Sequence, residues 1–323
     1  MAIPAIQWYP GHIAKAEKAL QEQLKRVDVV LEVRDARIPI STLHPSLDGW
    51  LGDKKRVLVI NRVDMISPAV RDRWQQWFKT QGKTAYFTDA NQGKGVGQIT
   101  KAAQAAGFAM NQRRKDRGMR PRPVRAVVIG FPNVGKSALI NRLLRRRIVE
   151  SARKAGVTRQ LRWVRISDEL ELLDSPGIIP AQLTNQEVAL KLAICDDIGK
   201  AAYDTQRIAA AFVDLLNQLD QQDNQPNLRT QLLARRYGLD PVGSTGETYL
   251  YQLAGEKFNG SQEQAARKML LEFRKGVLGN LSLELPPTAA SHVQSNAAKS
   301  NQSKAQKNSS SAVSAKSTDL PAV

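Results

Sequence analysis

Apolar residues in the first half of the chain follow helical spacing in some segments and form short continuous runs in others. Near the start they recur at three- and four-residue steps, the pattern of one helix face, at Ile13, Ala16, Leu20, Leu24 and Val27. Short apolar runs predict strands at 28–33, 56–60, 84–87, 124–129, 162–166 and 170–173. Helices are predicted from the Ser67-Pro68 cap to Gly82 and over 137–147. This alternation indicates an α/β fold, with a mostly parallel sheet covered on both faces.

The second half of the chain shows only helical spacing from about Thr184 onward. Its clearest helix has one apolar face, at Ile208, Phe212, Leu215 and Leu219. Ser261 and Gln264 form a capping box at the start of another helix. The last segment has no aromatic residue and is rich in Ser, Ala, Asn, Gln and Lys, so we expect it to be disordered. The pattern predicts three parts: an α/β domain with an N-terminal helix (1–183), a helical domain (184–287) and a disordered tail (288–323).

The charge balance of the chain is strongly basic. Lys and Arg total 48 and Asp and Glu total 30 among 323 residues, which gives a net charge of +18 and an isoelectric point near 10.1. A positive field of this strength attracts polyanions, and nucleic acid is the commonest of these. The cations concentrate in a basic connector at 113–125, in the arginine run at 145–147 and across 153–165. We therefore expect the protein to bind RNA.

The rest of the composition argues against a membrane or secreted protein. No run of about 18 apolar residues is present, so we expect no membrane span. The first residues lack a charged start followed by an apolar stretch, so we expect no secretory signal. The single cysteine, Cys195, cannot form an internal disulfide and is expected to fill a small apolar space. These features favour a cytoplasmic protein, which we expect to be monomeric.

A phosphate-loop motif lies between a predicted strand and a predicted helix. Residues 130–137 (GFPNVGKS) match the pattern GxxxxGK[ST]. The glycines of this pattern allow successive backbone N–H groups to converge on phosphates. Lys136 would bind the outer phosphates, and the hydroxyl of Ser137 would bind Mg²⁺. The motif predicts nucleotide binding without selecting the base.

The base is predicted by a second motif, which directly follows the strand at 56–60. Residues 61–64 (NRVD) resemble the guanine-recognition sequence Asn-Lys-x-Asp, with Arg62 in place of the usual lysine. Asp64 would accept two hydrogen bonds from the guanine edge, which adenine cannot offer, and Asn61 would brace the loop. Residues 88–90 (TDA), after the next strand, are the expected base-contacting turn. Together with the phosphate loop, these segments predict GTP as the ligand.

A third motif is typical of the part of a GTPase that responds to the γ-phosphate. Residues 174–177 (DSPG) follow the strand at 170–173 and resemble the sequence Asp-x-x-Gly. Asp174 would hold Mg²⁺ through water, and the N–H of Gly177 would contact the γ-phosphate. Thr158, in the segment before this motif, is the candidate switch threonine for Mg²⁺; its alternative is an ordinary surface-turn residue.

The order of these motifs is unusual. The guanine motif and the base turn precede the phosphate loop, whereas in most small GTPases they follow it. The same sheet can be built in this order if the original ends are joined and new ends are opened, which is a circular permutation. This order, with the N-terminal segment 6–16 (IQWYPGHIAKA), resembles the ribosome biogenesis GTPase A family over about residues 5–287. We therefore predict a circularly permuted P-loop GTPase fold with a C-terminal all-helical domain and a disordered tail.

The resemblance implies a GTPase that hydrolyses GTP during maturation of the large ribosomal subunit. It also implies GTP-gated binding to the subunit precursor and its rRNA, with RNA binding by the helical domain. Many GTPases orient the attacking water with a glutamine where this chain has Ile178, so we expect slow hydrolysis alone and stimulation by the ribosomal particle. The resemblance makes His12 the candidate catalytic histidine, the alternative being a cap on the first helix. Asn133 matches an asparagine that coordinates K⁺ in similar GTPases, or else braces the loop.

The candidate site residues fall into three groups. Nucleotide contacts are expected from Asn61, Arg62, Asp64, Thr88, Asp89, Ala90, Asn133, Val134, Gly135, Lys136, Ser137, Ala138 and Gly177. Metal ligands are expected to be Ser137, Thr158 and Asp174 for Mg²⁺, and Asn133 for K⁺. Catalytic roles are expected for His12, Lys136, Thr158 and Gly177. Two alternative functions stay open: a GTPase coupled to tRNA modification, and a non-hydrolysing RNA scaffold gated by GTP.

Overall fold

The computed structural model describes residues 6, 13–144, 162–175, 185–199, 202–223 and 228–287. The chain divides after Glu284 into a compact first unit and a C-terminal one. The predicted boundary between an α/β domain and a helical domain at 183/184 stays a prediction. The predicted disordered tail at 288–323 lies outside the described residues.

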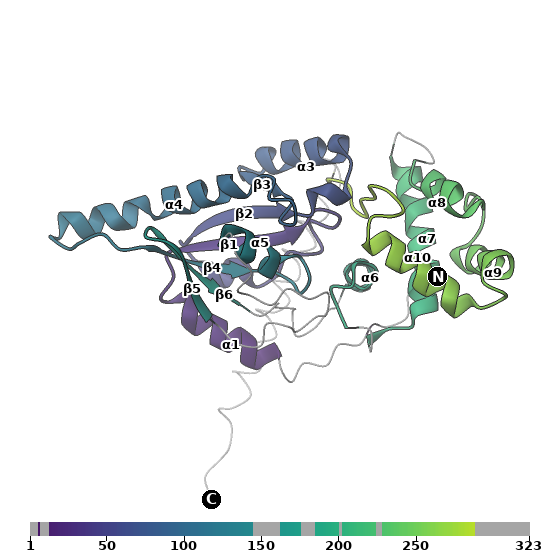
Figure 1. The fold of residues 1–323 in the computed structure, drawn as a ribbon, viewed down its shortest axis with the longest axis horizontal. Helices are drawn as coiled ribbons and strands as arrows, with labels where there is room; N and C mark the ends of the chain where they lie inside the picture. Colours follow the sequence, from purple (N-terminus) through teal and green to yellow (C-terminus); the bar gives the residue numbers. More distant parts are fainter. Residues whose placement is uncertain are drawn as a thin grey trace, which may run out of the picture. The chain divides into compact units, whose positions relative to one another are not determined.

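Among the described residues, six strands form one sheet in the order β3-β2-β1-β4-β6-β5 (Figure 1). Their bounds are β1 Val29–Asp35, β2 Lys55–Asn61, β3 Ala85–Thr88, β4 Val124–Ile129, β5 Arg162–Ser167 and β6 Leu170–Asp174. All neighbouring strands are parallel except β5 and β6, which are antiparallel. The predicted, mostly parallel sheet is therefore confirmed. The exception arises because only two residues connect β5 to β6, and so short a turn can join only antiparallel strands.

Strands β1 and β4 are neighbours at the centre of the sheet although they lie far apart in the chain. Val29 of β1 pairs with Ala126 of β4, and Glu32 pairs with Ile129. β2, on the other side of β1, leads into the guanine motif, and β4 leads into the phosphate loop. The sheet thus brings together motifs in the order that circular permutation requires.

One face of the sheet is covered by α1 (Ile13–Leu24), α2 (Leu47–Leu51) and α3 (Pro68–Thr80). The helices α1 and α2 bury an apolar cluster formed by Leu20, Leu24, Val27, Val30, Leu47, Leu51, Val127, Ile129 and Leu173. The helix α3 buries a second cluster formed by Ala36, Leu58, Ile60, Ile66, Trp74 and Phe78. On the same face Glu32, beside Leu58, accepts hydrogen bonds from Arg34 (2.7 Å) and Arg56 (3.1 Å). Charges buried on this face are therefore paired, which avoids the cost of an isolated buried charge.

The opposite face is covered by α4 (Val96–Asp116), which contacts α5 (Lys136–Leu143). Sequence reasoning missed α4, since it predicted no helix here and assigned residues 113–125 to a connector. The residues 113–116 belong to the helix, so this part of the connector prediction is wrong. The helix buries only Val96, Ile99, Ala103 and Gly107, and the last two are too small to extend a bulky apolar stripe along the helix. Small residues instead permit a close approach of the helix to the strands.

Other local predictions are confirmed by the structure. Ser67 caps α3 by accepting a hydrogen bond from the N–H of Val70 (3.3 Å). Ser261 caps α10 (Gln262–Arg274) in the same way, accepting from the N–H of Gln264 (3.4 Å). Cys195 is buried at the end of α6 (Gln186–Cys195), as expected for a small apolar filler.

The described residues from 185 onward that have regular structure are helical. The helices are α6 Gln186–Cys195, α7 Thr205–Gln222, α8 Thr230–Tyr237, α9 Gly246–Lys257 and α10 Gln262–Arg274. The helices α7, α9 and α10 pack against one another around Phe212 and Phe273, whose rings are 5.0 Å apart. No helix in the described ranges is long and apolar enough to cross a membrane.

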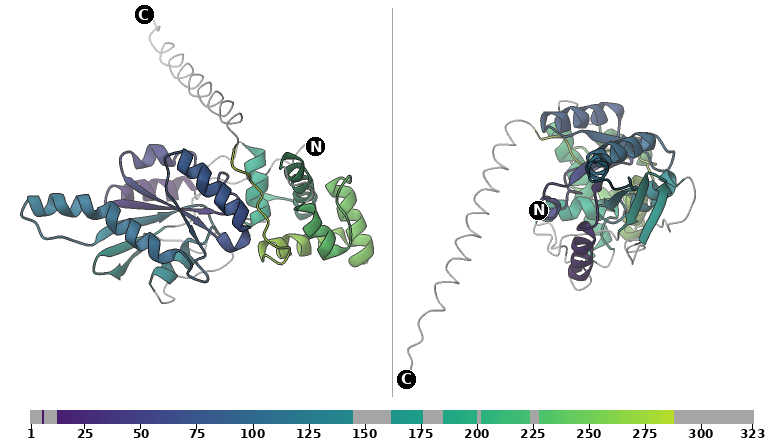
Figure 2. Two further views of the ribbon diagram at one scale, coloured as in Figure 1. Left: turned by 90° about the horizontal axis from the view of Figure 1, so that it is seen from above. Right: turned by 90° about the vertical axis from the view of Figure 1, so that its left-hand side faces the viewer.

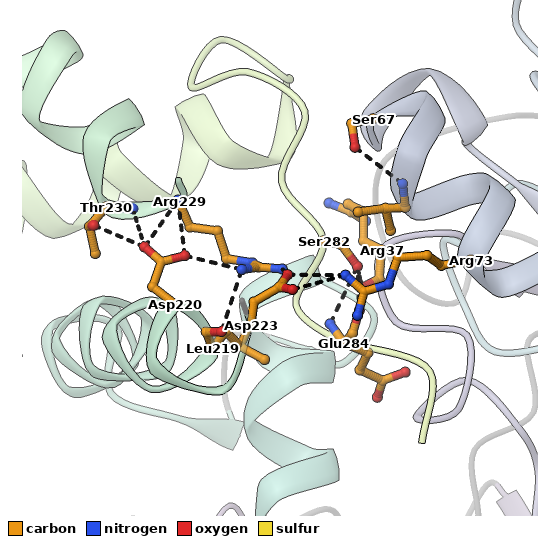
Figure 3. Close-up of polar contacts among 11 residues, drawn as sticks. Arg37, Ser67, Arg73, Leu219, Asp220, Asp223, Arg229, Thr230, Ser282 and Glu284 are labelled. Carbon is orange, nitrogen blue, oxygen red and sulfur yellow. Dashed lines mark hydrogen bonds and ion pairs between the residues drawn. The ribbon is translucent and has the colours of Figure 1, made fainter. Parts of the chain in front are cut away.

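Ion pairs connect the end of α7 to the start of α8, where they are buried, and to α3, where the arginine is partly exposed (Figure 3). The carboxylate of Asp220 accepts from the N–H groups of Arg229 (3.0 Å) and Thr230 (2.9 Å), and from the Thr230 hydroxyl (2.9 Å). Asp223 pairs with Arg229 (3.0 Å) and with Arg73 of α3 (3.0 Å). This arrangement joins a sheet-covering helix to the helices of the second half.

Candidate nucleotide-binding site

The predicted motifs that the structure describes lie at one edge of the sheet. Asn61 ends β2, Thr88 ends β3, and the phosphate loop begins directly after β4. Asp174 ends β6, and its backbone pairs with that of Val128 beside the start of the loop. The carboxyl ends of parallel strands meet at the same edge, where open α/β sheets bind their ligands.

The phosphate loop depends on glycine at two places. A Cβ at Gly130 would lie 2.3 Å from the carbonyl oxygen of Val33 in β1. A Cβ at Gly135 would lie 2.2 Å from the side-chain nitrogen of Asn61, and this residue has a φ of +96°. The absent side chains let the loop lie directly against β1 and the guanine motif.

The helix α5 begins at the end of the phosphate loop with Lys136, Ser137 and Ala138. The side chain of Lys136 is buried, and its Nζ donates to the carbonyl groups of Gly130 (3.1 Å) and Phe131 (2.7 Å). The ammonium group therefore lies inside the curve of the loop. The N–H groups at this helix start are suited to binding an anion.

Asn61 joins the phosphate loop to the base turn. Its Nδ2 donates to the carbonyl of Val134 (2.8 Å). Its Oδ1 accepts from the hydroxyl of Thr88 (3.2 Å) and from the N–H of Ala90 (3.1 Å). We call these four residues the Asn61 cluster. The expectation that Asn61 braces the loop is matched by these contacts, which also extend to the base turn.

The two carboxylates at the predicted base position have different surroundings. Asp89 is buried, and its Oδ1 accepts from the N–H groups of Asn91 (2.9 Å) and Gln92 (3.0 Å). This carboxylate therefore shapes the turn in which it lies. Asp64 is exposed to solvent, as a residue that receives a ligand must be. Partial burial and then the nearby charge of Asp89 raise the pKa of Asp64 above its usual value.

Arg62 lies beside the phosphate loop. Its backbone is left-handed (φ 65°), and its guanidinium donates to the carbonyl of Asn133. Its Nε also lies 3.4 Å from the carboxylate of Asp35, the last residue of β1. The arginine that replaces the usual lysine thus ties the guanine motif to the loop and to β1.

Sequence reasoning missed a buried ion pair next to this arginine. Arg37 donates to both carboxylate oxygens of Asp35 (3.0 and 2.7 Å), and both side chains are fully buried. Burial opposes ionisation of Asp35, but the charges of Arg37 and Arg62 lower its pKa below the usual value. Asp197 is also buried in this region, and burial followed by the charge of Asp35 raises its pKa well above the usual range. The signal in the sequence for this ion pair was an acid and an arginine, Asp35 and Arg37, close together just after a predicted strand.

A second missed residue, Arg142, connects α5 to the base turn. Its Nε donates to the carbonyl of Ala90 (3.2 Å), and its guanidinium also donates to that of Asn91. Its side chain passes so close to Gly93 that a Cβ there would lie 3.2 Å away. No motif includes this position. The contact depends on the packing of α5 beside the turn, which the sequence alone does not reveal.

Asn133 contacts the second half of the chain. Its φ is 57°, and its Nδ2 donates to the carbonyl of Asp196, the C-cap of α6. Arg274 of α10 pairs with the Asp196 carboxylate (3.3 Å) and donates to the carbonyls of Ala193 (2.7 Å) and Ile194 (2.9 Å). A continuous set of contacts therefore runs from the phosphate loop to α10.

Several predicted site residues lie outside the described residues. They are His12, Thr158 and Gly177. Asp174 is described only as part of the backbone of β6. The roles predicted for these four residues stay predictions.

The fold and the described site define a P-loop GTPase with its motifs in permuted order. Residues 125–233 match a family model described as 50S ribosome-binding GTPase. Ribosome biogenesis GTPase A of Bacillus pumilus is 35% identical over 73% of this chain and 81% of its own length. The protein of that name from Bacillus cereus is 32% identical over 90% of this chain and 97% of its own. The crystal structure of GNP-bound YlqF from T. maritima has the same fold, with a TM-score of 0.56, 24% identity and coverage of 84% and 98%.

These similarities extend over most of the chain and over most of each relative. The chain therefore belongs to the ribosome biogenesis GTPase A family, and it is a GTP-hydrolysing enzyme. The fold predicted from the order of the motifs is confirmed.

Proposed function

We propose that this GTPase acts in ribosome maturation, on the precursor of the large subunit, and that bound GTP gates its binding to ribosomal RNA. The observation that carries the proposal is the Asn61 cluster, whose hydrogen bonds join the guanine motif to the phosphate loop and to the base turn. Relatives named ribosome biogenesis GTPase A, and a family described as 50S ribosome-binding, support the ribosomal target. The net charge of +18 supports an RNA partner.

In the proposed pocket each described segment has one task. The N–H groups of the loop and of the start of α5 bind the phosphates, with Lys136 beside the outer ones. Asp64 accepts hydrogen bonds from the guanine edge. Arg62, Thr88, Asp89 and Ala90 hold the loop and the base turn at the spacing of the nucleoside.

The residues at this edge fit a magnesium ion. Ser137 lies in the first turn of α5, and Asp174 ends the strand next to β4. A hydroxyl and a carboxylate beside phosphates are ligands that Mg²⁺ accepts, and Thr158 would complete the set. The ion would neutralise charge between the β- and γ-phosphates. For K⁺, the ligand would be Oδ1 of Asn133, since its Nδ2 is bonded to the Asp196 carbonyl.

We expect slow hydrolysis by the protein alone, because Ile178 cannot orient a water molecule by hydrogen bonding. His12 is the proposed group that positions the water when the ribosomal particle is bound, and the N–H of Gly177 contacts the γ-phosphate. The protein would act as a monomer in the cytoplasm, with its helical half contacting RNA.

The test is co-sedimentation with large-subunit precursors in GDP or in a non-hydrolysable GTP analogue, combined with turnover measured with and without particles. Analogue-dependent binding and particle-stimulated turnover support the proposal. Turnover that depends only on tRNA would indicate a role in tRNA modification, and absent turnover a scaffold. His12→Ala should retain GTP binding and lose the stimulation. Replacing KCl by NaCl at equal ionic strength should slow turnover if Asn133 binds K⁺.

A further inference from the structure

The C-terminal part of α4 extends past the end of the sheet. The last buried residue of α4 is Gly107, where a Cβ would lie 2.3 Å from the side chain of Val124 at the start of β4. No side chain from Phe108 to Arg120 is buried, and the structure describes all of them. Figures 1 and 2 show this end of α4 extending beyond the strands. We call residues 108–120 the basic projection.

The basic projection is held in shape by its own hydrogen bonds. Nδ2 of Asn111 donates to the carbonyl of Arg122 (2.9 Å), and Oδ1 of Asn111 accepts from the N–H of Arg122 (3.1 Å). The N–H of Met119 donates to the carbonyl of Arg114 (2.9 Å), and Nε of Arg114 donates to that of Arg120 (3.1 Å). The returning chain is therefore fastened to the helix, and a partner would meet an ordered surface.

The projection carries a concentrated positive charge. It contains one acid, Asp116, and five cations: Arg113, Arg114, Lys115, Arg117 and Arg120. None of these cations forms an ion pair with a carboxylate in the described ranges. At the base of the projection, by contrast, Arg122 pairs with Asp28 (2.8 Å) and Arg125 with Glu171 (3.4 Å). The helix dipole favours Arg113, Arg114 and Lys115 in the last turn of α4. Arg117 and Arg120 lie beyond the helix, and like charges close together cost stability, so the dipole does not explain the whole cluster.

Apolar side chains accompany these charges. Phe108 is 68% exposed and Met119 is 40% exposed. Both belong to the small set of large apolar residues that are exposed in the described chain. Phe108 and Lys115 are seven positions apart and so share one face of the helix. An exposed aromatic ring beside clustered cations is the combination that binds single-stranded nucleic acid, through base stacking and phosphate contacts.

We propose that the basic projection is an RNA-binding surface, with its arginines on phosphates and Phe108 against an unpaired base. The inference rests on the proposed function, which supplies RNA as the partner. Four of the five cations are arginines, whose planar guanidinium matches phosphate oxygens with paired hydrogen bonds. The projection starts at the amino end of β4, whereas the phosphate loop follows its carboxyl end. The surface therefore adds RNA affinity without forming part of the nucleotide pocket.

The experiment compares two triple variants of the full-length protein that lose the same charge. The projection variant is Arg113→Ala/Lys115→Ala/Arg117→Ala, which leaves Arg114 and Asn111 to hold the shape. The control variant is Lys55→Ala/Lys79→Ala/Lys101→Ala, whose lysines are exposed and form no ion pair in the described part of the chain. Binding of a fluorescently labelled RNA stem–loop is measured by anisotropy over a range of salt concentrations, together with GDP affinity and thermal unfolding.

The projection variant should bind the RNA at least about tenfold more weakly than the control variant, with a salt slope reduced by about two to three. Its GDP affinity and unfolding temperature should match those of the unmodified protein. Phe108→Ala should weaken binding about fivefold or more, while binding of a fully paired duplex stays unchanged. Equal losses in the two triple variants, or no loss in either, would overturn the inference. The bound RNA is also challenged with nucleic-acid competitors and with polyglutamate. If polyglutamate displaces it and the nucleic-acid competitors do not, the projection binds an acidic protein, and the inference is overturned.

Co-sedimentation with large-subunit particles separates this inference from the proposed function. If the unmodified protein does not bind the particles, the proposed function fails. If it binds them and the projection variant binds equally well, the RNA-binding role of the projection fails by itself.

Discussion

Two buried polar side chains hold separate elements together, one in each half of the molecule. Asn61 is 2% exposed and bonds to Val134, Thr88 and Ala90. Asp220 is 3% exposed and bonds to Arg229 and Thr230, which we call the Asp220 cluster. The two sets are similar in size but differ in charge: the first is neutral, and the second is a buried ion pair.

The two clusters also differ in what depends on them. The Asn61 cluster lies at the ligand edge of the sheet, so its geometry must suit a nucleotide. The Asp220 cluster joins the end of α7 to the start of α8, so its geometry must only suit the fold. A buried hydrogen-bond network therefore has a recognisable sequence motif where a ligand restricts which residues can form it. Where only packing restricts it, other residues could serve equally well.

The largest effect is expected from Asp220→Ala. The change removes one of the two carboxylates that pair with the guanidinium of Arg229, which is 4% exposed, and removes the acceptor of the Arg229 and Thr230 N–H groups. It should lower the free energy of unfolding by about 3–5 kcal/mol. Urea unfolding followed by circular dichroism measures this loss. GDP affinity per folded molecule should stay unchanged. Asp220→Asn keeps an acceptor but removes the charge, so its loss of stability should be milder than that of Asp220→Ala. The loss that remains would show that the charge matters as well as the hydrogen bonds.

Asn61→Ala should destabilise the protein less than Asp220→Ala does, but it should strongly weaken nucleotide binding. The Val134 carbonyl and the Ala90 N–H lose their partner, which should cost about 2–3 kcal/mol. GDP affinity should fall at least about tenfold, because the loop and the base turn are no longer joined. Calorimetric titration with GDP measures it. A variant that unfolds more easily yet binds GDP normally would contradict the distinction between the clusters.

Acid should affect the helical half before the sheet. Glu272, a paired carboxylate of this half with a lowered pKa, is a glutamate, and in the unfolded chain a glutamate takes up a proton at a higher pH than an aspartate such as Asp35 of the sheet. Hydrogen bonds from Arg236, and then from Tyr237, lower the pKa of Glu272 in α10 to about 2. A carboxylate with a lowered folded pKa stabilises the fold above its unfolded pKa of about 4.3, and this stability is lost as the pH falls toward 2. Since Arg236 is partly exposed, we expect the free energy of unfolding to fall by about 2 kcal/mol, which is less than the whole pKa shift of Glu272 would imply.

The chain provides a way to observe the two halves separately. All five tryptophans precede residue 184, so their fluorescence reports on the sheet while circular dichroism also reports on the helices. Circular dichroism should change at a higher pH than fluorescence. Glu272→Gln should bring the two transitions together; coincident transitions in the unmodified protein would argue against this explanation.

The smallest effect is expected from Thr88→Val. The change keeps the size of the side chain and removes one hydrogen bond to Asn61, of 3.2 Å. The expected loss of stability is about 1 kcal/mol, since Asn61 keeps its other two contacts. GDP affinity should fall only a few-fold. Thr88→Ser, which retains the hydroxyl, should restore the affinity, and a failure to do so would mean that the methyl group matters instead.

Much of the site could be read from the sequence because its motifs are short and continuous. The phosphate loop and the guanine motif each follow an apolar strand, so their positions at one edge follow from strand order. Arg142 and the pair Asp35–Arg37 could not be predicted in this way. The contacts of Arg142 join segments distant in the chain, and no local pattern encodes which segments will pack together. Asp35 and Arg37 are only two residues apart, but their spacing does not show that both side chains are buried.

The sequence by itself determined the α/β class, the strands, two helix caps and the order of the nucleotide motifs, because each depends on residues close together in the chain. The tertiary structure alone decided that Asn61 joins the phosphate loop to the base turn. It also decided that α4 continues past the sheet as a basic projection, since its alanine-rich surface gives no periodic signal of its length. Both depend on distances between segments, and those distances are fixed only when the strands pair and the helices pack on them.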